Sequence, residues 1–206
     1  MPPRLLLATG NAGKQKELRE LLADCGWEFA FPGQLGISMD IEETGDTYAE
    51  NAKIKAVHAC LAAGIPALAD DSGLAVQALG GAPGVWSARY AGPNATDADQ
   101  REKLLTELRD VPPERRGATF ECVIAIAVPN GSGDASVTYC QGRCEGRILE
   151  RERGEGGFGY DPVFFLPGLR RTMAELSSKD KNAVSHRGKA AKEARRLLKS
   201  LASQYE

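Results

Sequence analysis

Two adjacent carboxylates, Asp70 and Asp71, are the residues of this chain that point most directly to chemistry. They follow an apolar run at residues 65–69 and precede Ser72 and Gly73. Each carboxylate raises the pKa of the other unless a cation or strong donors intervene, and Mg²⁺ binds such oxygens. A buried strand that ended here would place both groups at a sheet edge, where α/β proteins bind ligands. One interpretation is a metal-assisted site; the other, which these four residues alone favour, is a surface turn.

The segment at residues 9–14 could bind phosphate. It follows a short apolar run and precedes a helical pattern, and backbone N–H groups at a helix N-terminus can hold phosphate oxygens. Lys14 would add positive charge to this turn. The segment is not a P-loop, because Ala8 and Gln15 stand where that motif has Gly and a hydroxyl residue. A strand-to-helix turn with a solvent-exposed lysine fits the same residues equally well.

Two segments nearer the C-terminus could contact a base or an anion. Residues 154–159 match G-x-G-x-x-G, but a β-favouring run follows them and no helix begins there, so the dinucleotide-binding motif is excluded. We expect a flexible loop in which Phe158 either stacks on a base or fills the core beside a hinge. His186 and Arg187 open the last predicted helix, whose N-terminus attracts anions.

Composition and charge limit the classes of partner that the chain can have. Its 206 residues are 42% hydrophobic and 26% charged, as in globular proteins. The net charge of −2 provides no general attraction to nucleic acid or to an anionic membrane, so we expect neither as a partner. Residues 40–50 contain five acids and no base, whereas residues 179–199 contain eight bases and two acids. Such runs are usually solvated faces, although they would also suit a metal ion and a polyphosphate.

The five cysteines favour a reducing compartment. They include no C-x-x-C pair, their number is odd, and the N-terminus lacks a secretory pattern. No apolar run approaches the ~20 residues that a membrane span requires. We therefore expect free thiols and a cytoplasmic location.

The order of apolar runs and helical patterns predicts a mixed α/β chain of one domain. Thr47 with Glu50 forms a capping-box pattern ahead of one helix, and Gly64 is a stop signal after it. We expect strands at residues 4–8, 27–31, 66–69, 120–128, 136–144 and 163–165, helices at residues 14–25, 47–63, 97–111 and 185–202, and a loop at residues 85–92. These elements would form a mixed sheet with flanking helices, arranged as two lobes around a central substrate cleft.

Eight stretches, taken in chain order, resemble the inosine triphosphate pyrophosphatase family, whose members are also called XTP/dITP diphosphatases. They lie at residues 8–14, 42–45, 50–56, 69–74, 79–85, 87–90, 157–162 and 185–188. Each stretch is weak alone, but eight in the right order over almost the whole chain are specific. With this resemblance, an active site becomes the favoured interpretation of Asp70 and Asp71, in place of a surface turn.

The resemblance implies a function for the whole chain. Residues 1–206 would form a single nucleotide pyrophosphatase domain with two lobes, which acts as a homodimer with Mg²⁺ as its cofactor. The reaction would hydrolyse ITP, dITP and XTP to the monophosphate and pyrophosphate, and so remove deaminated purine nucleotides from the pool. A related pyrophosphatase for other modified nucleotides and a non-catalytic nucleotide binder are the alternatives.

The resemblance also implies roles for individual residues. Asp71 would be the general base and a metal ligand, and Asp70 would support the same cluster. Glu42 would be the second metal ligand, with Glu43 as the open alternative. The remaining matched positions would bind the triphosphate, position the water or form the nucleoside pocket; they are Thr9, Gly10, Asn11, Ala12, Gly13, Lys14, Lys55, Ser72, Phe158, Gly159, Tyr160, Asp161, Lys181, His186 and Arg187.

Overall fold

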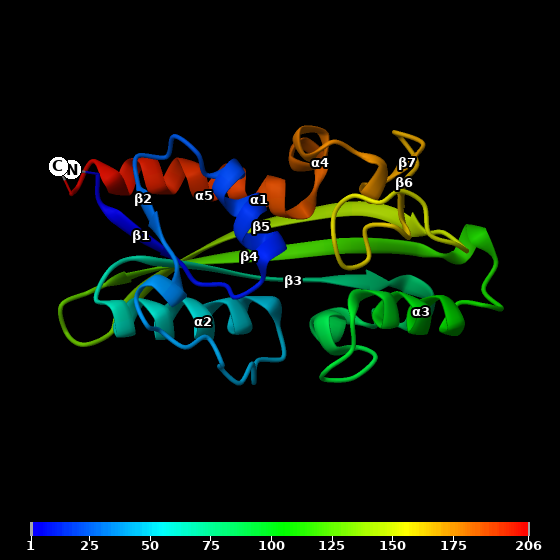
Figure 1. Cartoon of the computed structure of the whole chain (residues 1–206), viewed down its shortest axis with the longest axis horizontal. Helices are drawn as coiled ribbons and strands as arrows, with labels where there is room; N and C mark the ends of the chain where they lie inside the picture. Colours follow the sequence, from blue (N-terminus) through cyan, green and yellow to red (C-terminus); the bar gives the residue numbers. More distant parts are fainter. Residues whose placement is uncertain (1, 206) are drawn as a thin grey trace. The chain divides into compact units, whose positions relative to one another are not determined.

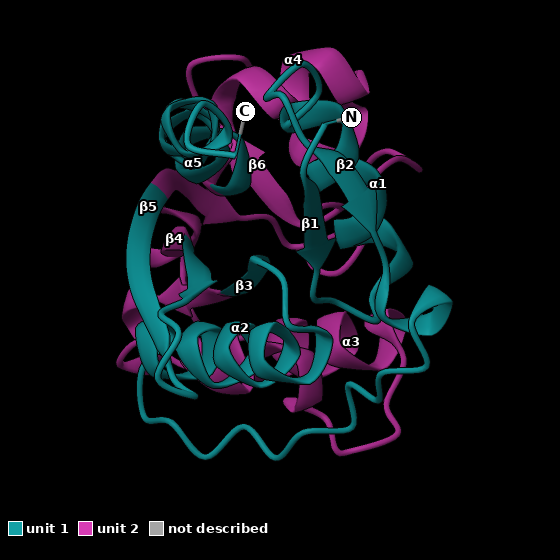
Figure 2. Ribbon diagram, turned by 90° about the vertical axis from the view of Figure 1, so that its left-hand side faces the viewer, with its two compact units in different colours: residues 1–71, 122–142, 187–206 teal, residues 72–121, 143–186 magenta. Residues whose placement is uncertain are grey.

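The computed structural model describes residues 2–205, which divide into two compact units that are coloured separately in Figure 2. Of these residues, unit 1 comprises 2–71, 122–142 and 187–205, and unit 2 comprises 72–121 and 143–186. Each unit has apolar core clusters of its own.

Within the described residues, one mixed sheet has seven strands in the order β2-β1-β3-β4-β5-β6-β7. The strands are β1 (Arg4–Leu7), β2 (Glu28–Ala30), β3 (Ala67–Val76), β4 (Gly117–Pro129), β5 (Ala135–Ile148), β6 (Phe164–Leu166) and β7 (Arg171–Thr172). β1 pairs in parallel with β2 and β3, whereas β6 pairs antiparallel with β5 and β7. The expected mixed α/β sheet is therefore confirmed, and the expected central cleft stays a prediction.

Five α-helices flank the strands in the described part of the chain (Figure 1). They are α1 (Ala12–Leu21), α2 (Tyr48–Ala63), α3 (Asp97–Glu107), α4 (Ser178–Val184) and α5 (His186–Ala202). Short 3₁₀ helices lie at Pro32–Gln34, Gln77–Leu79, Gly84–Arg89, Pro113–Arg115 and Met173–Glu175.

Unit 1 has helices on both faces of its strands. Figures 1 and 2 show α2 on one face and α1 with α5 on the other. Successive strand residues point to opposite faces, so Leu5 and Leu7 join the core beneath α1 and α5, while Leu6 joins the core beneath α2. The α2 face consists of small buried residues such as Ala52 and Ala56, which lets this helix lie close to the sheet.

Unit 2 has its own apolar core between α3 and the strands. Leu104 of α3 and Leu108, the C-cap of this helix, contribute to it, together with Val76, Phe120 and Phe164 from three strands. Both views show α3 and α4 on opposite sides of the unit 2 strands (Figures 1 and 2).

Local capping signals place the ends of α2 correctly. The Thr47 side chain accepts a hydrogen bond from the Glu50 N–H, and the Glu50 side chain closes the capping box. Gly64 ends the helix in the left-handed conformation, at φ 66°. These ends matter because α2 carries Lys55, one of the predicted site residues.

The predictions near the C-terminus omit one short helix. The segment before residue 185 forms α4, which begins because the Ser177 side chain accepts a hydrogen bond from the Asp180 N–H. Ser185 is extended, at φ −68° and ψ 159°, and separates α4 from α5. The expected loop at residues 85–92 is also partly helical, since Gly84–Arg89 forms a 3₁₀ turn.

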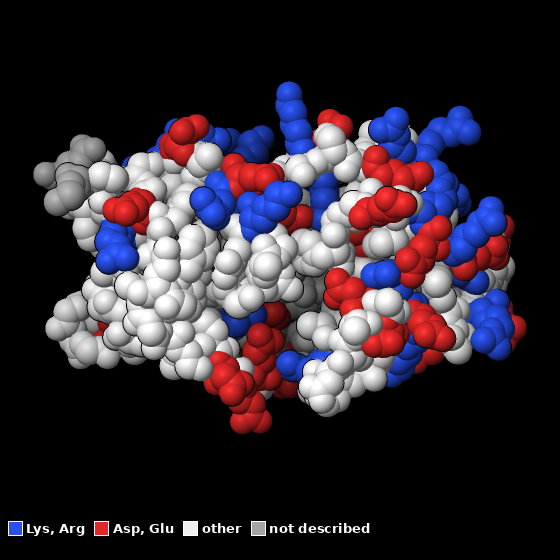
Figure 3. Space-filling model, in the orientation of Figure 1, with Lys and Arg blue, Asp and Glu red and all other residues white. Residues whose placement is uncertain are grey.

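In the view of Figure 3, most charged side chains, of both signs, lie on the right, and much of the left is uncharged. None of the helices in the described part of the chain combines the length and apolar character that a bilayer span needs.

All five cysteines are free and buried, which confirms the expected free thiols. Burial raises the pKa of Cys122 and of Cys140 to about 12, and nearby carboxylates add to the effect. Both thiols are therefore protonated and unreactive at every pH well below 12.

We expect the folded protein to react with essentially no DTNB at pH 8, and all five thiols to react after unfolding in guanidinium. Rapid labelling of the folded protein at pH 8 would contradict this expectation.

Candidate active site

Asp70 and Asp71 lie inside β3 and not at its end. The strand continues to Val76, because Leu74 and Val76 extend its buried apolar pattern beyond Gly73. The expected end of this strand at residue 69 is therefore wrong. Successive side chains of a strand point to opposite faces, so the two carboxylates point away from each other. They therefore contact different cations.

Asp70 is 1% exposed and is held by two cations. Arg187 donates to Asp70 Oδ2 from Nε and from Nη2, each at 3.1 Å, and Lys14 Nζ lies 3.2 Å from the same oxygen. Arg187 Nη1 also donates to Glu17 Oε2 at 2.7 Å. Burial alone would raise the pKa of the Asp70 carboxyl. The attraction of Lys14, Arg187 and Lys55 outweighs burial and holds this pKa well below its usual value, so Asp70 stays ionised.

Asp71 is 6% exposed and pairs with Lys55 of α2. Lys55 Nζ donates to Asp71 Oδ1 at 2.9 Å and to Glu43 Oε1 at 3.0 Å. Burial disfavours the charged form of Lys55, but the nearby carboxylates outweigh burial and raise the pKa of this ammonium. The balance at Asp71 is the opposite, because burial outweighs the attraction of Lys55 and raises the pKa of this carboxyl. Asp71 Oδ2 is buried and has no hydrogen-bond partner among residues 2–205.

The two neighbouring carboxylates have opposite pKa shifts. Asp70 is an ionised counter-ion whose Oδ2 accepts from Arg187. Asp71 has the higher pKa, which suits a group that accepts a proton.

Side-chain hydrogen bonds stabilise the turn between β1 and α1. Thr9 Oγ1 accepts from the Asn11 N–H at 3.2 Å, and Asn11 caps α1 by accepting from the Lys14 N–H at 2.9 Å. Gln15 Nε2 donates to the Thr9 carbonyl at 2.7 Å. Because β1 and β3 are parallel neighbours, the turn lies beside the strand that carries Asp70, and Lys14 reaches that carboxylate. Gly10 lies in the same turn, and Ala12 and Gly13 are the first two residues of α1.

In unit 2, Asp161 links Phe158 to Lys181. Asp161 is 3% exposed, and its Oδ2 accepts from the Phe158 N–H at 2.9 Å and from Lys181 Nζ at 2.5 Å. Lys181 Nζ lies 4.7 Å from the centre of the Phe158 ring. Glycine is required at position 157, because a Cβ there would lie 2.1 Å from Asp161 Oδ2. The segment that we expected to be a flexible loop is thus fastened by hydrogen bonds, including one from the Gly156 N–H to the Ala174 carbonyl at 3.0 Å.

Two other predicted site residues contribute to the packing of unit 2. Tyr160 is 5% exposed and donates its hydroxyl to the Ser87 carbonyl at 2.9 Å. The His186 ring is buried and stacks on Phe120, with centroids 4.6 Å apart. Ser72 is half-buried in β3.

The structure adds three polar residues that sequence reasoning missed. Glu17 accepts from Arg187, and both Asp97 and Arg101 contact the backbone of Gly159. No local signal marks them, because each partner is at least 58 positions away in the chain.

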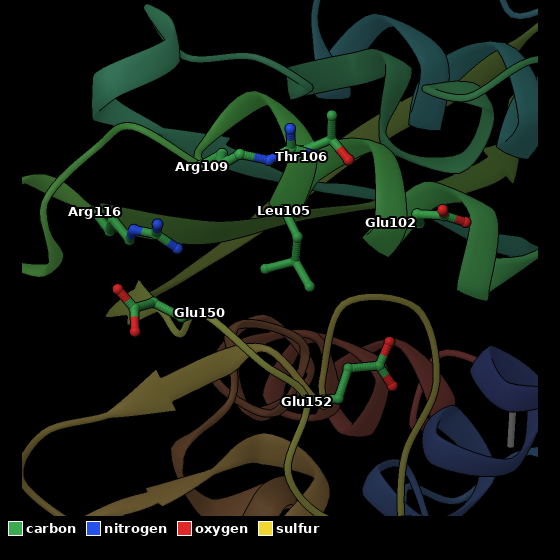
Figure 4. A pocket seen from close by; sticks show the side chains of 7 residues that line it. All are labelled: Glu102, Leu105, Thr106, Arg109, Arg116, Glu150 and Glu152. Carbon is green, nitrogen blue, oxygen red and sulfur yellow. The ribbon is translucent and has the colours of Figure 1, made fainter.

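A cavity of about 460 Å³ in unit 2 involves none of the predicted site residues. Figure 4 shows side chains of α3 on one side of it and Glu150 with Glu152 on the other. The lining residues are Glu102, Leu105, Thr106, Arg109, Arg116, Glu150 and Glu152. Arg116 is buried, and its guanidinium donates to the Leu108 and Val111 carbonyls. Its positive charge therefore stabilises carbonyl groups at the C-terminal end of α3.

Few protein side chains in this site are placed to coordinate a metal ion. Among residues 2–205, no group of three or more His, Cys, Asp or Glu side chains is placed to hold a metal. Asp71 and Glu43 converge on Lys55, whereas Glu42 is exposed. Mg²⁺ is usually bound by one or two carboxylates, with phosphates and water as its other ligands. The buried Asp71 Oδ2, which has no hydrogen-bond partner in the described chain, fits such an ion.

Known proteins resemble this chain over most of its length. The family whose sequence model matches it is the Ham1 family, over residues 5–197. A dITP/XTP pyrophosphatase of Salmonella paratyphi A is 51% identical over 189 residues, which cover 92% of this chain and 94% of that protein. A dITP/XTP pyrophosphatase of Desulforamulus reducens is 50% identical over 198 residues, which cover 96% of each chain. The solved structure of a HAM1 protein from Coxiella burnetii is 46% identical with a TM-score of 0.86, and the match covers 96% of this chain and 99% of that one. The resemblance drawn from the eight stretches is thereby confirmed, and the chain belongs to the Ham1 family.

Proposed function

We propose that this chain is a nucleoside-triphosphate pyrophosphohydrolase that converts ITP, dITP and XTP to the monophosphate and pyrophosphate. Relatives about half identical to it are named dITP/XTP pyrophosphatases. The observation that carries the proposal is the buried carboxylate of Asp71, which has one oxygen on Lys55 and the other without a partner in the described chain. Such a group can orient a water molecule and take its proton while cations neutralise the phosphates.

We propose Mg²⁺ as the cofactor, held by Asp71 together with Glu42 or Glu43. The ammonium of Lys55 contacts both Asp71 and Glu43, which supports a preference for cations at this position. When bound, Mg²⁺ neutralises phosphate charge and polarises the phosphorus that is attacked.

We propose that the triphosphate is bound by the β1–α1 turn and by lysines. Lys14 and Lys55 are mostly buried cations, and the N-terminus of α1 provides a positive end of the helix dipole. The residues with this proposed role are Thr9, Gly10, Asn11, Ala12, Gly13, Lys14, Lys55 and Ser72. Attack at the α-phosphorus requires this charge neutralisation, because both the attacking and the leaving oxygens are electron-rich.

We propose that unit 2 residues distinguish the base. Hypoxanthine and xanthine present O6 as an acceptor and N1–H as a donor, whereas adenine presents an amine at that position. A pocket that donates to O6 leaves its donors unpaired against adenine, at a cost of about 1–3 kcal/mol for each buried group. Guanine shares O6 and N1–H, so it must be rejected at its 2-amino group. The proposed nucleoside contacts are Phe158, Gly159, Tyr160, Asp161, Lys181 and His186. Arg187 has the same proposed role.

We also propose that the enzyme acts as a homodimer in the cytoplasm, where the nucleotide pool is available to it. The homodimer rests on the family resemblance and is tested by light scattering of the purified protein.

The test of the proposed function is a substrate panel with product identification. The protein is incubated with ITP, dITP, XTP, dUTP and GTP in the presence of Mg²⁺, with EDTA as the metal-free control. We expect pyrophosphate and the monophosphate from the first three nucleotides, little product from dUTP and GTP, and no turnover in EDTA.

Two results would contradict the proposal. Comparable turnover of GTP and ITP would remove the base specificity. Release of orthophosphate instead of pyrophosphate would place the attack at the γ-phosphorus.

A further inference from the structure

We propose that Asp97 and Arg101 of α3 are positioning residues for base selection, because they hold the peptide next to Phe158. The proposal rests on the proposed function, in which Phe158 contacts the base. The Gly159 N–H donates to Asp97 Oδ2 at 2.6 Å, and Arg101 Nη1 donates to the Gly159 carbonyl at 2.8 Å. Two side chains one helical turn apart thus hold both backbone polar groups of a single residue.

The N-terminus of α3 leaves the Asp97 carboxylate available for this contact. Thr96 is the N-cap, and its N–H and hydroxyl both donate to Asp99 Oδ2 at 2.7 Å. The Asp99 N–H donates back to Thr96 Oγ1 at 3.2 Å, so capping is done by Thr96 and Asp99. Arg101 also donates from Nε to Glu152 Oε1 at 2.8 Å, but the Glu152 side chain is 44% exposed, so solvent weakens this ion pair.

Phe158 therefore has an anchored peptide group on each side. Its own N–H donates to Asp161 Oδ2 at 2.9 Å, and the N–H of the next peptide donates to Asp97. Gly159 has φ +60° and open space around it, so the backbone conformation and not crowding requires glycine there. Two carboxylates, Asp161 and Asp97, hold the backbone around Phe158 and with it the position from which its ring extends against Lys181.

The direction of this ring affects base selection more than turnover. A displaced ring still stacks on any purine, because every base has a π-face. Hydrogen bonds to the exocyclic groups depend on the angle at which the ring holds the base, so they weaken first. The proposed chemistry at phosphorus involves Asp71 and Lys55, which α3 does not contain. Loss of the Asp97 or Arg101 hydrogen bond to the Gly159 backbone should therefore raise the KM for dITP and reduce discrimination against dGTP, while kcat changes little.

The experiment compares Asp97→Ala and Arg101→Met with two matched controls. Glu152→Gln removes the exposed partner of Arg101 and leaves its bond to Gly159, and Arg109→Met removes an exposed arginine of the same helix region. We expect each test variant to raise the KM for dITP about tenfold, which is the loss of one charge-assisted hydrogen bond, with kcat within about twofold. The preference for dITP over dGTP should fall by a similar factor, the controls should match the wild type, and Arg101→Lys should recover part of the loss.

A second measurement separates positioning from general stability. Amide exchange of Gly159, followed by NMR, should accelerate in Asp97→Ala, while melting temperatures of the test variants stay close to that of Arg109→Met. An unchanged KM and an unchanged dITP-to-dGTP preference in both test variants would overturn the inference. A wild-type protein that binds dITP without releasing pyrophosphate would overturn the proposed function instead, and the ratio of Kd values for dITP and dGTP would then decide the role of Asp97 and Arg101.

Discussion

Asp71→Asn should abolish hydrolysis of dITP while the nucleotide still binds. We expect kcat to fall about 10³-fold, because an amide neither takes a proton from water nor binds a divalent cation as a carboxylate does. The side chain keeps its shape, and Lys55 retains Glu43 as a partner at 3.0 Å, so the site should stay folded. Pyrophosphate release measures the loss of turnover, and titration calorimetry with dITP measures the retained binding.

Asp46→Asn is the matched control for this variant. Asp46 is an exposed acid of the acidic segment at residues 40–50, outside β3, and its conversion to the amide removes one negative charge without touching the buried carboxylates. Its kcat should equal that of the wild type. If Asp71→Asn kept more than about a tenth of the wild-type kcat, a loss smaller than general-base catalysis supplies, Asp71 could not be the base. Strong, salt-sensitive oligonucleotide binding without any turnover would instead favour a nucleic-acid binder.

Sequence patterns predict the elements of this fold well where the controlling contacts are local. Thr47 and Glu50 are three positions apart, so the capping box that begins α2 can be read directly from the sequence. The prediction that β3 ends at residue 69 is wrong because the local signals there are misleading. Asp, Ser and Gly are strong local turn signals, but the buried Leu74 and Val76 continue the strand through them.

The contacts that define the candidate site are mostly distant in sequence. Arg187 lies 117 positions from Asp70 and 170 positions from Glu17, and Asp97 lies 62 positions from Gly159. No periodicity or spacing can report such pairs, because they depend on how strands and helices are arranged in space. The ordered stretches of the family resemblance predict Asp71 and Lys55 as site residues, but they do not reveal that Asp70 and Arg187 form a buried ion pair.

Arg187→Met should destabilise the fold strongly. Arg187 is 2% exposed and donates twice to Asp70, which is itself 1% exposed. Removal of one partner from a buried pair leaves the other charge poorly compensated, and such changes cost about 3–5 kcal/mol. Lys14 still contacts Asp70 at 3.2 Å, so we expect a loss near the lower limit, about 3 kcal/mol. Urea unfolding at pH 7 measures this loss.

The control is Arg196→Met, which removes an exposed arginine from the same helix and should change the free energy of unfolding by at most about 0.5 kcal/mol. The double variant Asp70→Asn with Arg187→Met then tests the cause. If the loss arises from an uncompensated buried carboxylate, removing that charge should make the double variant more stable than the sum of the two single losses predicts. Additive losses would mean that the two side chains act independently. Unchanged stability would show that the ion pair of Arg187 with Asp70 does not stabilise the fold, whereas a rise in the KM for dITP is expected from the proposed nucleoside contact of Arg187.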